Sequence, residues 1–325
     1  MSHTPAALCI GVCNVDVIAH VDDSFLERHS LDKGTTTVLS SDALLNLMGY
    51  LNRPFYLPGG CAANTACGLG LEDVDTTFCG MIGTDFYGDI FRNGFKSYNV
   101  AYHPVTDVKK HTSLCITLIT PDKERSFVLA TDMASWFLPE NTLPDRDTTR
   151  PLIVYIETNM FRMTAGTDKP SMVHAVLDKY AADDARIILN LVDTEVTGHH
   201  RDLITALMGD RLAFIVGNHE EMKVLFNADT IEAMESAALA SGQSCVITMG
   251  DRGVTLIHKD AISRIPSVVH LKPADIVDTV GAGDQFSAGF IAGLVEGMDL
   301  EACCAQGMQH ATEILRQPGA RPLAA

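Results

Sequence analysis

The chain has 325 residues and a formal net charge of −17, so it can bury a large core of one domain plus an accessory element. The negative charge opposes binding to nucleic acid or to an anionic membrane surface. The sequence shows no signal peptide and no apolar run long enough to span a bilayer. The nine cysteines are scattered without a Cys-x-x-Cys pair, which argues against zinc chemistry and against a disulfide framework. We therefore expect a soluble cytoplasmic globular protein that binds neither nucleic acid nor membrane.

The first apolar run, residues 8–12, predicts a buried strand, and Asn14 and Asp16 follow directly after it. In an open α/β sheet, ligands bind beyond the carboxyl ends of the strands, so Asp16 is well placed to bind a substrate. A carboxylate accepts two hydrogen bonds from neighbouring hydroxyls, which suits a ribose or sugar edge. An Asx turn at a strand end would explain the same residue without a ligand.

Three short segments rich in Thr, Val, Ile and Leu then interrupt the α/β rhythm: 31–39, 113–120 and 126–130. They predict strands outside the main α/β alternation, and the alternative is that they form an ordinary hairpin of the main domain. Between them, Gly59-Gly60 precede a predicted helix over 62–69. Two glycines let the backbone approach a ligand closely, and Asn64 in the first turn offers both a donor and an acceptor. The alternative is a tight turn with Asn64 as a local cap.

The middle of the chain alternates apolar strand segments with amphipathic helical segments. The predicted strands are 76–80, 152–156, 186–191 and 212–216, and the predicted helices are 85–98, 171–180, 201–208 and 218–226. This alternation favours a parallel sheet covered by helices on both faces. No internal repeat or linker divides the chain, so we expect a single domain over residues 1–325.

The last third begins with a predicted strand over 244–248, a tight turn with two glycines and a second strand that ends at His258. Residues 277–286 then lead into a helix that ends near Glu296, because its apolar residues recur at helical spacing. Gly281-Ala282-Gly283 therefore lie at a helix start, where free N–H groups and the helix dipole suit a phosphate or a developing oxyanion. Asp284 in the first turn should be ionised and able to accept a proton. These are the groups that phosphoryl transfer to an alcohol needs; a Gly-rich turn followed by an ordinary Asp is the alternative.

Two motifs are similar to the signatures of the PfkB/ribokinase family of small-molecule kinases. Pro58-Gly59-Gly60-Cys61-Ala62-Ala63-Asn64 resembles the amino-proximal signature, and Asp278-Thr279-Val280-Gly281-Ala282-Gly283-Asp284 resembles the carboxy-proximal one. Two signatures in the right order are far more specific than either alone. The resemblance implies a ribokinase-like three-layer α/β sandwich with a mostly parallel central sheet, and a small β lid from parts of 31–39 and 113–130. It also implies ATP-dependent transfer of a phosphoryl group to a hydroxyl of a sugar or nucleoside, with magnesium (Mg2+) as the metal.

The same resemblance implies roles for individual residues. Asp284 is the catalytic base, and the anion site beside it is formed by Gly281, Ala282 and Gly283. The substrate is bound by Asn14, Asp16, Gly59, Gly60 and Asn64. The nucleotide is bound by Asn218, Thr248, Gly250 and Gly253, Glu221 helps to position magnesium, and a helix near 300–315 flanks the adenine. A capped helix with an acidic first turn would explain Asn218 and Glu221 without a ligand.

The acceptor is less well defined than the reaction. Gly11-x-x-Asn14-x-Asp16 is similar to the ribokinase-type first strand, whereas residues 21–31 and the ending 319–322 are similar to the adenosine kinase branch. Residues 129–136 should face the substrate but depart from both branches, and Asp132 is unexpected beside a nucleoside base. We expect a nucleoside acceptor, with a sugar as the alternative, and a monomer or a homodimer.

The sequence argues against two other classes of protein. A sensor that binds a nucleotide or sugar without catalysis would not need Asp284 or the intact Gly281-Ala282-Gly283. A dinucleotide-binding oxidoreductase would need a Gly-x-Gly-x-x-Gly motif after the first strand, and that motif is absent. The kinase interpretation is therefore preferred.

Overall fold

The computed structural model describes residues 6–145, 151–166, 168–181, 185–209, 211–267 and 269–323. A nine-stranded sheet forms its centre, in the order β14-β13-β12-β11-β10-β9-β1-β5-β6. Its strands are β1 (Ala6–Ile10), β5 (Thr76–Gly83), β6 (Val100–Asp107), β9 (Leu152–Glu157), β10 (Arg186–Asn190), β11 (Phe214–Asn218), β12 (Cys245–Thr248), β13 (Val254–His258) and β14 (Ala261–Ile265). The pairings are parallel except for those of β13 with β12 and β14, so the predicted mostly parallel sheet is confirmed.

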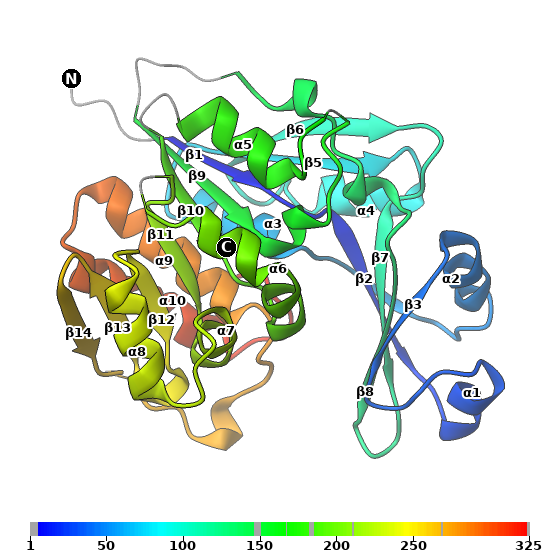
Figure 1. The fold of residues 1–325 in the computed structure, drawn as a ribbon. Helices are drawn as coiled ribbons and strands as arrows, with labels where there is room; N and C mark the ends of the chain where they lie inside the picture. Colours follow the sequence, from blue (N-terminus) through cyan, green and yellow to red (C-terminus); the bar gives the residue numbers. More distant parts are fainter. Residues whose placement is uncertain are drawn as a thin grey trace.

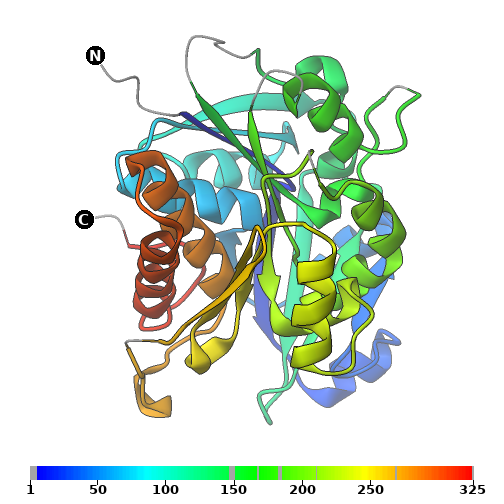
Figure 2. The same ribbon diagram turned by 60° about the vertical axis from the view of Figure 1, so that its left-hand side comes forward.

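Helices cover both faces of this sheet (Figure 2). One face carries α3 (Cys61–Leu71), α9 (Ala282–Glu296) and α10 (Leu300–Ile314). The other face carries α5 (Met172–Tyr180), α6 (Thr194–Ala206), α7 (His219–Leu225) and α8 (Ile231–Ala240). The inner strands are mostly apolar, as strands buried on both faces must be; Ile153 to Ile156 of β9, for example, are all buried. The three predicted layers are therefore present.

A second sheet of five strands lies beside the central one, with α1 (Asp23–Arg28) and α2 (Ser41–Met48) on its far side (Figure 1). Its strands are β2 (Asn14–His20), β3 (Thr36–Leu39), β4 (Phe55–Pro58), β7 (Ser113–Ile119) and β8 (Arg125–Ala130), in the order β3-β8-β7-β2-β4. The helix α4 (Phe86–Asn93) packs where the two sheets meet. Along β2, buried Val15, Val17 and Ala19 alternate with less buried residues, so one face of this sheet is covered and the other is partly open.

The second sheet is larger than the sequence analysis predicted. Of the predicted β-rich segment 31–39, only the last four residues form a strand, because the chain turns at Gly34 with a φ of +74°. Two further strands, β2 and β4, were not predicted. The chain passes from the first sheet to the second within residues 11–13, so Asp16 lies inside a strand and not in the Asx turn considered above.

Two predicted helices have different bounds. The helix predicted over 201–208 already begins at Thr194, because the Asp193 side chain accepts a hydrogen bond from the Val196 N–H and caps it. The helix predicted over 85–98 ends at Asn93, and Gly94 follows as its C-terminal cap.

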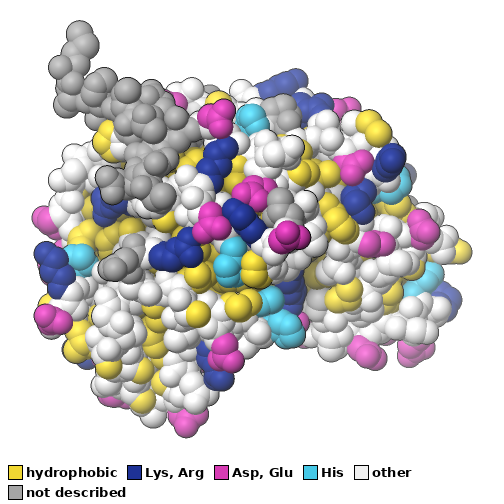
Figure 3. Space-filling model, turned by 45° about the horizontal axis from the view of Figure 1, so that its top comes forward, with side chains coloured by type: hydrophobic (Ala, Val, Ile, Leu, Met, Phe, Trp, Pro, Cys, Tyr) yellow, Lys and Arg dark blue, Asp and Glu magenta, His cyan; other side chains and the backbone are white. Residues whose placement is uncertain are grey.

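The face turned toward the viewer in Figure 3 shows Lys and Arg interspersed with Asp and Glu. Several of these charges form ion pairs in the structure: Lys169 lies 3.2 Å from Asp178, and Asp178 also pairs with Arg211 at 2.7 Å. Among the described residues, no helix combines the length and the apolar character needed to cross a membrane.

Candidate active site

A cavity of about 750 Å³ opens where the parallel strands of the central sheet end. Its wall includes Glu157, Asn190, Asn218 and Thr248, which are the last residues of β9, β10, β11 and β12. This is the edge of an open parallel sheet where ligands bind. The wall also contains most of the predicted site residues: Asn14, Asp16, Gly60, Asn64, Asn218, Glu221, Thr248, Gly250, Gly281, Ala282, Gly283 and Asp284. The structure therefore brings together residues from both motifs.

The N-terminus of α9 points into this cavity. Gly281 is the N-cap residue, with a φ of +81° that favours glycine, and a Cβ there would come 2.5 Å from Ala320 Cα. No side chain caps this helix end, although the first N–H groups of a helix have no carbonyl partner within it. A Cβ added to Gly283 would meet no atom within 4 Å. An anion could therefore approach these N–H groups closely.

Asp284 lies in the first turn of α9 and is 8% exposed. Its Oδ2 accepts a hydrogen bond of 2.9 Å from Asn64 Nδ2, and its backbone carbonyl accepts one of 3.1 Å from Thr65 Oγ1. Burial raises the pKa of the carboxyl to about 6, although hydrogen bonds from Asn64 and Cys61 lower it. The group is thus mostly ionised at neutral pH, with a pKa close to the working pH of a general base.

Asp16 faces the same cavity from β2. Asn14 Nδ2 donates a hydrogen bond of 2.7 Å to Asp16 Oδ1. Burial also raises the pKa of this carboxyl to about 6, while Asn14 and Arg321 lower it. Gly59 lies behind Asp16 and does not line the cavity; Gly60 does, with a φ of +95°. A Cβ on Gly60 would come 2.2 Å from the carbonyl oxygen of Val12, so the turn requires glycine.

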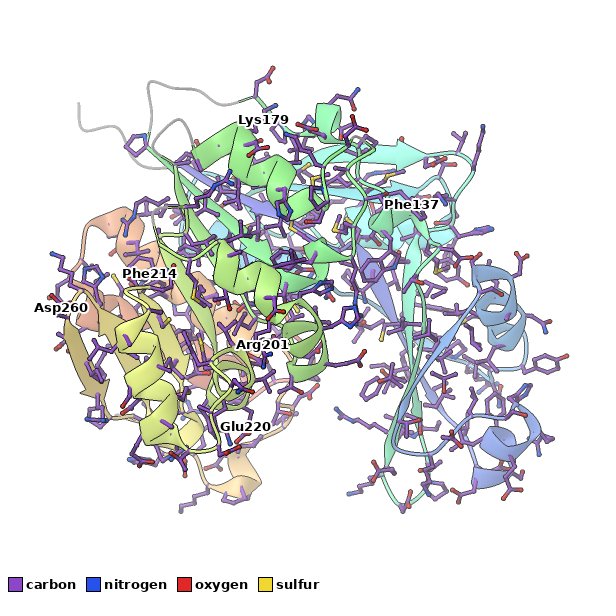
Figure 4. All side chains as sticks on the ribbon, in the orientation of Figure 1. Phe137, Lys179, Arg201, Phe214, Glu220 and Asp260 are labelled. Atoms are coloured by element: carbon purple, nitrogen blue, oxygen red, sulfur yellow. The ribbon has the colours of Figure 1, made fainter. Side chains whose placement is uncertain are left out.

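The opposite end of the cavity is formed by Asn218 and Glu221. Asn218 Oδ1 accepts hydrogen bonds from the N–H groups of Glu220 and Glu221, and Glu221 Oε2 accepts one from Asn218 N at 2.8 Å. These bonds form a capping box for α7, so the capped-helix interpretation is correct. Both residues nevertheless line the cavity, as does the neighbouring Glu220 (Figure 4). Burial, opposed by the Asn218 hydrogen bonds, raises the pKa of Glu221 to about 7.

A smaller cavity of about 270 Å³ adjoins the larger one and shares Thr248, Gly250, Ala282, Gly283 and Phe286 with it. Its wall is mostly apolar and comes from β13, the segment before α9, and α10. The remaining lining residues include Val254, Val269, Leu271, Ile276, Met308, Ala311 and Leu315. Gly253 lines this smaller cavity with a φ of +102°, and a Cβ there would come 2.1 Å from the carbonyl oxygen of Ile265.

Glu157 is a buried cavity residue that the sequence analysis missed. Its two oxygens accept hydrogen bonds from Val12 N at 3.1 Å and from Ala62 N at 2.9 Å, which joins the end of β1 to the start of α3. Burial raises its pKa to about 7. The sequence did contain a signal for this residue: Glu157 directly follows the predicted strand 152–156, and Asp16 likewise comes shortly after the predicted strand 8–12. Arg321, which the sequence analysis places only in the chain ending 319–322, also contacts this site, because it donates hydrogen bonds to Asn64 and to the Gly59 carbonyl.

Asp132, the acidic residue that is unexpected beside a nucleoside base, lies at the start of α2. Its carboxylate accepts hydrogen bonds from Ser41 N at 2.9 Å and from Ser41 Oγ at 3.0 Å. Ser41 is the first residue of α2, where a carboxylate is favoured by the free N–H groups and the dipole. Asp132 does not line the main cavity, so it anchors a helix of the second sheet.

Within the described ranges, no group of three or more His, Cys, Asp or Glu side chains is arranged to hold a metal ion on its own. All nine cysteines are free. The site therefore consists of carboxylates, asparagines and backbone N–H groups around one cavity.

Comparison with known proteins agrees with this geometry. Residues 7–324 match the model of the pfkB family of carbohydrate kinases. An adenosine kinase of Dictyostelium discoideum is 27% identical, over 96% of this chain and 95% of its own. The crystal structure of adenosine kinase from Sinorhizobium meliloti superposes with a TM-score of 0.83 at 24% identity, over 98% of this chain and 96% of the other. A probable sugar kinase from Rhizobium etli gives a TM-score of 0.84 at 23% identity, over 99% and 96%. As its two motifs predicted, the chain belongs to the pfkB family of carbohydrate kinases.

Proposed function

We propose that this protein transfers the γ-phosphoryl group of ATP to a hydroxyl of a nucleoside. The observation that carries the proposal is that Asp284, the open N-terminus of α9 and Asp16 all line one cavity. A phosphate bound at the helix start and a hydroxyl compound bound at Asp16 would meet beside the buried carboxylate. The adenosine kinase of Dictyostelium discoideum, similar over nearly the whole chain, supports a nucleoside acceptor.

In this mechanism Asp284 takes the proton of the acceptor hydroxyl as the hydroxyl oxygen attacks the γ-phosphorus. The bond between that phosphorus and the oxygen bridging to the β-phosphate breaks, and the electron pair leaves with ADP. General-base catalysis of this kind contributes roughly 10²–10⁴-fold. The N–H groups at Gly281 to Gly283 donate to the oxygens on which negative charge develops, as fixed donors in a partly closed cavity can do without reorganisation. The second product is ADP, which leaves from the other end of the cavity.

The smaller cavity suits the base of the nucleotide. It joins the larger cavity beside Gly283, so a purine there would place its phosphates at the N-terminus of α9. Its walls are mostly apolar, and one of them is formed by Met308 of α10 and by Leu315, which follows that helix. This assignment keeps the predicted nucleotide-binding roles of Thr248, Gly250 and Gly253, which line the smaller cavity. Asn218 lines the larger cavity and would lie near the phosphates.

The donor set at Glu221 fits magnesium. Besides burial, the carboxylates of Asp193 and Asp284 raise the pKa of Glu221, so a cation beside Glu221 would offset negative charge there. Magnesium usually binds through one or two carboxylates together with water and phosphate oxygens. We infer that Glu221 would hold Mg2+, directly or through water. Bound there, the ion would neutralise negative charge on the nucleotide phosphates.

The surface around Asp16 favours a nucleoside over a bare sugar. Asp16 lies opposite Leu57 of β4 and Cys115 of β7, and Cys115 lies opposite Leu129 of β8. Residues opposite one another in neighbouring strands project on the same face. Leu57 is 42% exposed. The carboxylate therefore borders an apolar surface that could cover a flat base while Asp16 binds the ribose hydroxyl pair.

The second sheet would act as the lid predicted from the sequence. It carries Asp16, and three of its connections to the rest of the fold are short, at residues 11–13, 59–60 and 108–112. Its rotation toward the cavity would cover the acceptor and exclude water. On this proposal the chain is one kinase domain with a lid built from β2, β3, β4, β7 and β8. That the protein is cytoplasmic, a monomer or homodimer, and without a nucleic-acid partner stays a prediction.

The test is a direct assay of ADP formation with ATP and magnesium, using adenosine, cytidine, ribose and fructose as separate acceptors. We expect turnover with a nucleoside and a nucleoside monophosphate by mass spectrometry. Thermal shifts with the same compounds should agree, because a ligand at about a hundred times its Kd stabilises the folded state by about 2.7 kcal/mol. Turnover with a sugar only would make the protein a sugar kinase. Binding without turnover of any acceptor would make it a sensor.

A further inference from the structure

The C-terminal segment 316–323 lies against both motifs of the site. Gln285 Nε2, on α9 next to Asp284, donates to the Ala320 carbonyl at 3.0 Å and to the Asn64 carbonyl at 3.0 Å. Tyr98 Oη donates to the Pro322 carbonyl at 2.7 Å. The segment is therefore held in place by groups on α9, on α3 and on the turn after α4.

Arg321 is the central residue of this segment and is 9% exposed. Its Nε donates to Asn64 Oδ1 at 3.0 Å, Nη1 to the Gly94 carbonyl at 3.1 Å, and Nη2 to the Gly59 carbonyl at 3.3 Å. The guanidinium also lies 5.0 Å from the ring centre of Phe95. None of the ion pairs found among the described residues includes Arg321. A buried cation thus has only neutral direct partners.

The two partners of the Asn64 side chain leave only one orientation for its amide. A guanidinium can only donate hydrogen bonds, so the atom that faces Arg321 must be the amide oxygen. An ionised carboxylate can only accept, so the atom that faces Asp284 must be the amide nitrogen, and the observed Nδ2–Oδ2 distance is 2.9 Å. Without Arg321, the amide would be held by Asp284 alone, and its oxygen would lose the donors that fix the plane of the amide group.

We propose that Arg321 is a positioning residue for the phosphoryl transfer: it fixes the Asn64 amide so that Asn64 holds the Asp284 carboxylate toward the acceptor. The inference rests on the proposed function, in which Asp284 is the base. With Oδ2 occupied by Asn64, the other carboxylate oxygen is the one available for the acceptor hydroxyl. Arg321 does not touch the reacting atoms and acts only through Asn64 and through its charge.

The charges around Asp284 give Arg321 a second effect on the base. The acidic groups that face it are Asp16 from β2, Cys61 from α3, Glu157 and Tyr155 from β9, and Glu221 from α7. Arg321 is the cation that lowers the pKa of both Asp284 and Asp16. Its removal should therefore raise the pKa of Asp284 and move the acidic limb of the pH–rate profile to higher pH.

The first experiment is a double-mutant cycle with Arg321→Lys and Asn64→Ala. Lysine keeps the charge but cannot reproduce the three-way fork of donors. We expect Arg321→Lys to lower kcat about ten- to hundredfold, the scale of one hydrogen bond to a charged group, with little change in the KM for ATP. In the Asn64→Ala background the same substitution should have no further effect, because its effect passes through Asn64. Additive losses would overturn the proposal.

The matched control is Tyr98→Phe, which removes another tether of the same segment without touching Asn64. It should change stability but leave kcat and the pH profile as in the wild type. A loss of kcat equal to that of Arg321→Lys would show that the segment matters only as a structural support.

A measurement independent of turnover separates this inference from the proposed function. Carbon-13 labelling of the aspartate carboxyls, with Asp284 assigned by its absence in Asp284→Asn, gives the pKa of Asp284 by NMR titration. We expect a value near 6 in the wild type, a higher value in Arg321→Gln, and no change in Tyr98→Phe. If the wild type phosphorylates no acceptor, the function fails while the titration still tests the coupling. An unchanged pKa in folded Arg321→Gln would overturn the charge effect.

Discussion

Gly59 lies directly against the carboxylate of Asp16. A Cβ on Gly59 would come 2.5 Å from Asp16 Oδ2 and 2.8 Å from its Cγ, closer than real atoms approach. The Gly59 backbone cannot easily move away, because its N–H donates to the Asn14 carbonyl at 2.8 Å and its carbonyl accepts from Arg321. The first glycine of the amino-proximal motif therefore makes room for the Asp16 carboxylate, although it does not line the cavity itself.

Substitution Gly59→Ala should displace Asp16 and weaken acceptor binding. Hydrogen bonds to a charged group are worth roughly 1.5–3 kcal/mol, so we expect the acceptor KM to rise about ten- to hundredfold, as it should in Asp16→Ala. The KM for ATP should change little, because the nucleotide cavity lies at the other end of the site. Gly198→Ala, at an exposed position of α6, is the control. Normal acceptor kinetics in Gly59→Ala would mean that Asp16 does not bind the acceptor.

A second prediction concerns the anion site at the start of α9. Alanine at Gly283 would meet no protein atom within 4 Å, and alanine is a better helix former than glycine by roughly 1 kcal/mol. The Gly283→Ala variant should thus be at least as stable as the wild type. Its methyl group would, however, occupy space that a phosphate needs in order to reach the N–H groups. We expect a stable protein with a higher KM for ATP or a lower kcat, and unchanged ATP kinetics would place the phosphates elsewhere.

The parts of the site that the sequence predicted are those with a local signal. Gly281 and Asp284 belong to one helix start, and Asn218 and Glu221 to one capping box, so a few neighbouring residues carry the pattern. The parallel sheet was predicted for the same reason, since each apolar strand is followed by its own helix. The strand β2 also had a short local signal, because polar and apolar residues alternate from Asn14 to Val17.

Contacts between distant positions left no such signal. Arg321 and Asn64 are 257 positions apart, and Glu157 and Val12 are 145 apart. No spacing rule connects them, since their proximity depends on the order of the strands in the sheet. Asp132 was unexplained for the same reason, because its partner Ser41 lies 91 positions earlier. Only the assembled fold shows that Asp132 contacts the start of α2 and that Arg321 contacts Asn64.

The role of Asp132 gives a third prediction. If it only anchors α2, Asp132→Ala should destabilise the second sheet by about 1 kcal/mol, as expected for the loss of a helix-capping carboxylate. The ratio of kcat/KM between adenosine and cytidine should stay as in the wild type. Thermal unfolding together with kinetics on the two nucleosides checks both expectations. A changed ratio in a folded variant would instead make Asp132 a specificity residue.

The fourth prediction concerns turnover in Asp284→Asn, which keeps the size of the side chain but removes the base. Turnover should fall roughly 10²–10⁴-fold, the typical contribution of a general base. Binding of ATP and of the acceptor should change little, because neither depends mainly on this carboxylate. Turnover and acceptor binding are to be measured on the same preparation. Lost binding together with lost turnover would make Asp284 a substrate anchor, and near-normal turnover would remove it from the mechanism.

The same substitution gives a prediction for stability and pH. The pKa of Asp284 is about 6 in the folded protein against an ordinary value of 3.8, so the folded state binds the proton more tightly than the unfolded state does. The contribution of Asp284 to stability therefore falls as the pH rises from about 4 to about 6, and the full cost of its buried charge is present above that range.

Asparagine carries no charge at any pH and avoids this cost. Without ligands at pH 7.5, Asp284→Asn should thus be more stable than the wild type, by at most about 3 kcal/mol at 1.36 kcal/mol per pKa unit. The difference should shrink toward pH 4, where the wild-type carboxyl is protonated in both states. Urea unfolding at several pH values measures this directly, with Asp260→Asn in the exposed turn between β13 and β14 (Figure 4) as the control. A wild type more stable than Asp284→Asn at pH 7.5 would show that Asn64 and Arg321 compensate fully for the burial of this carboxylate.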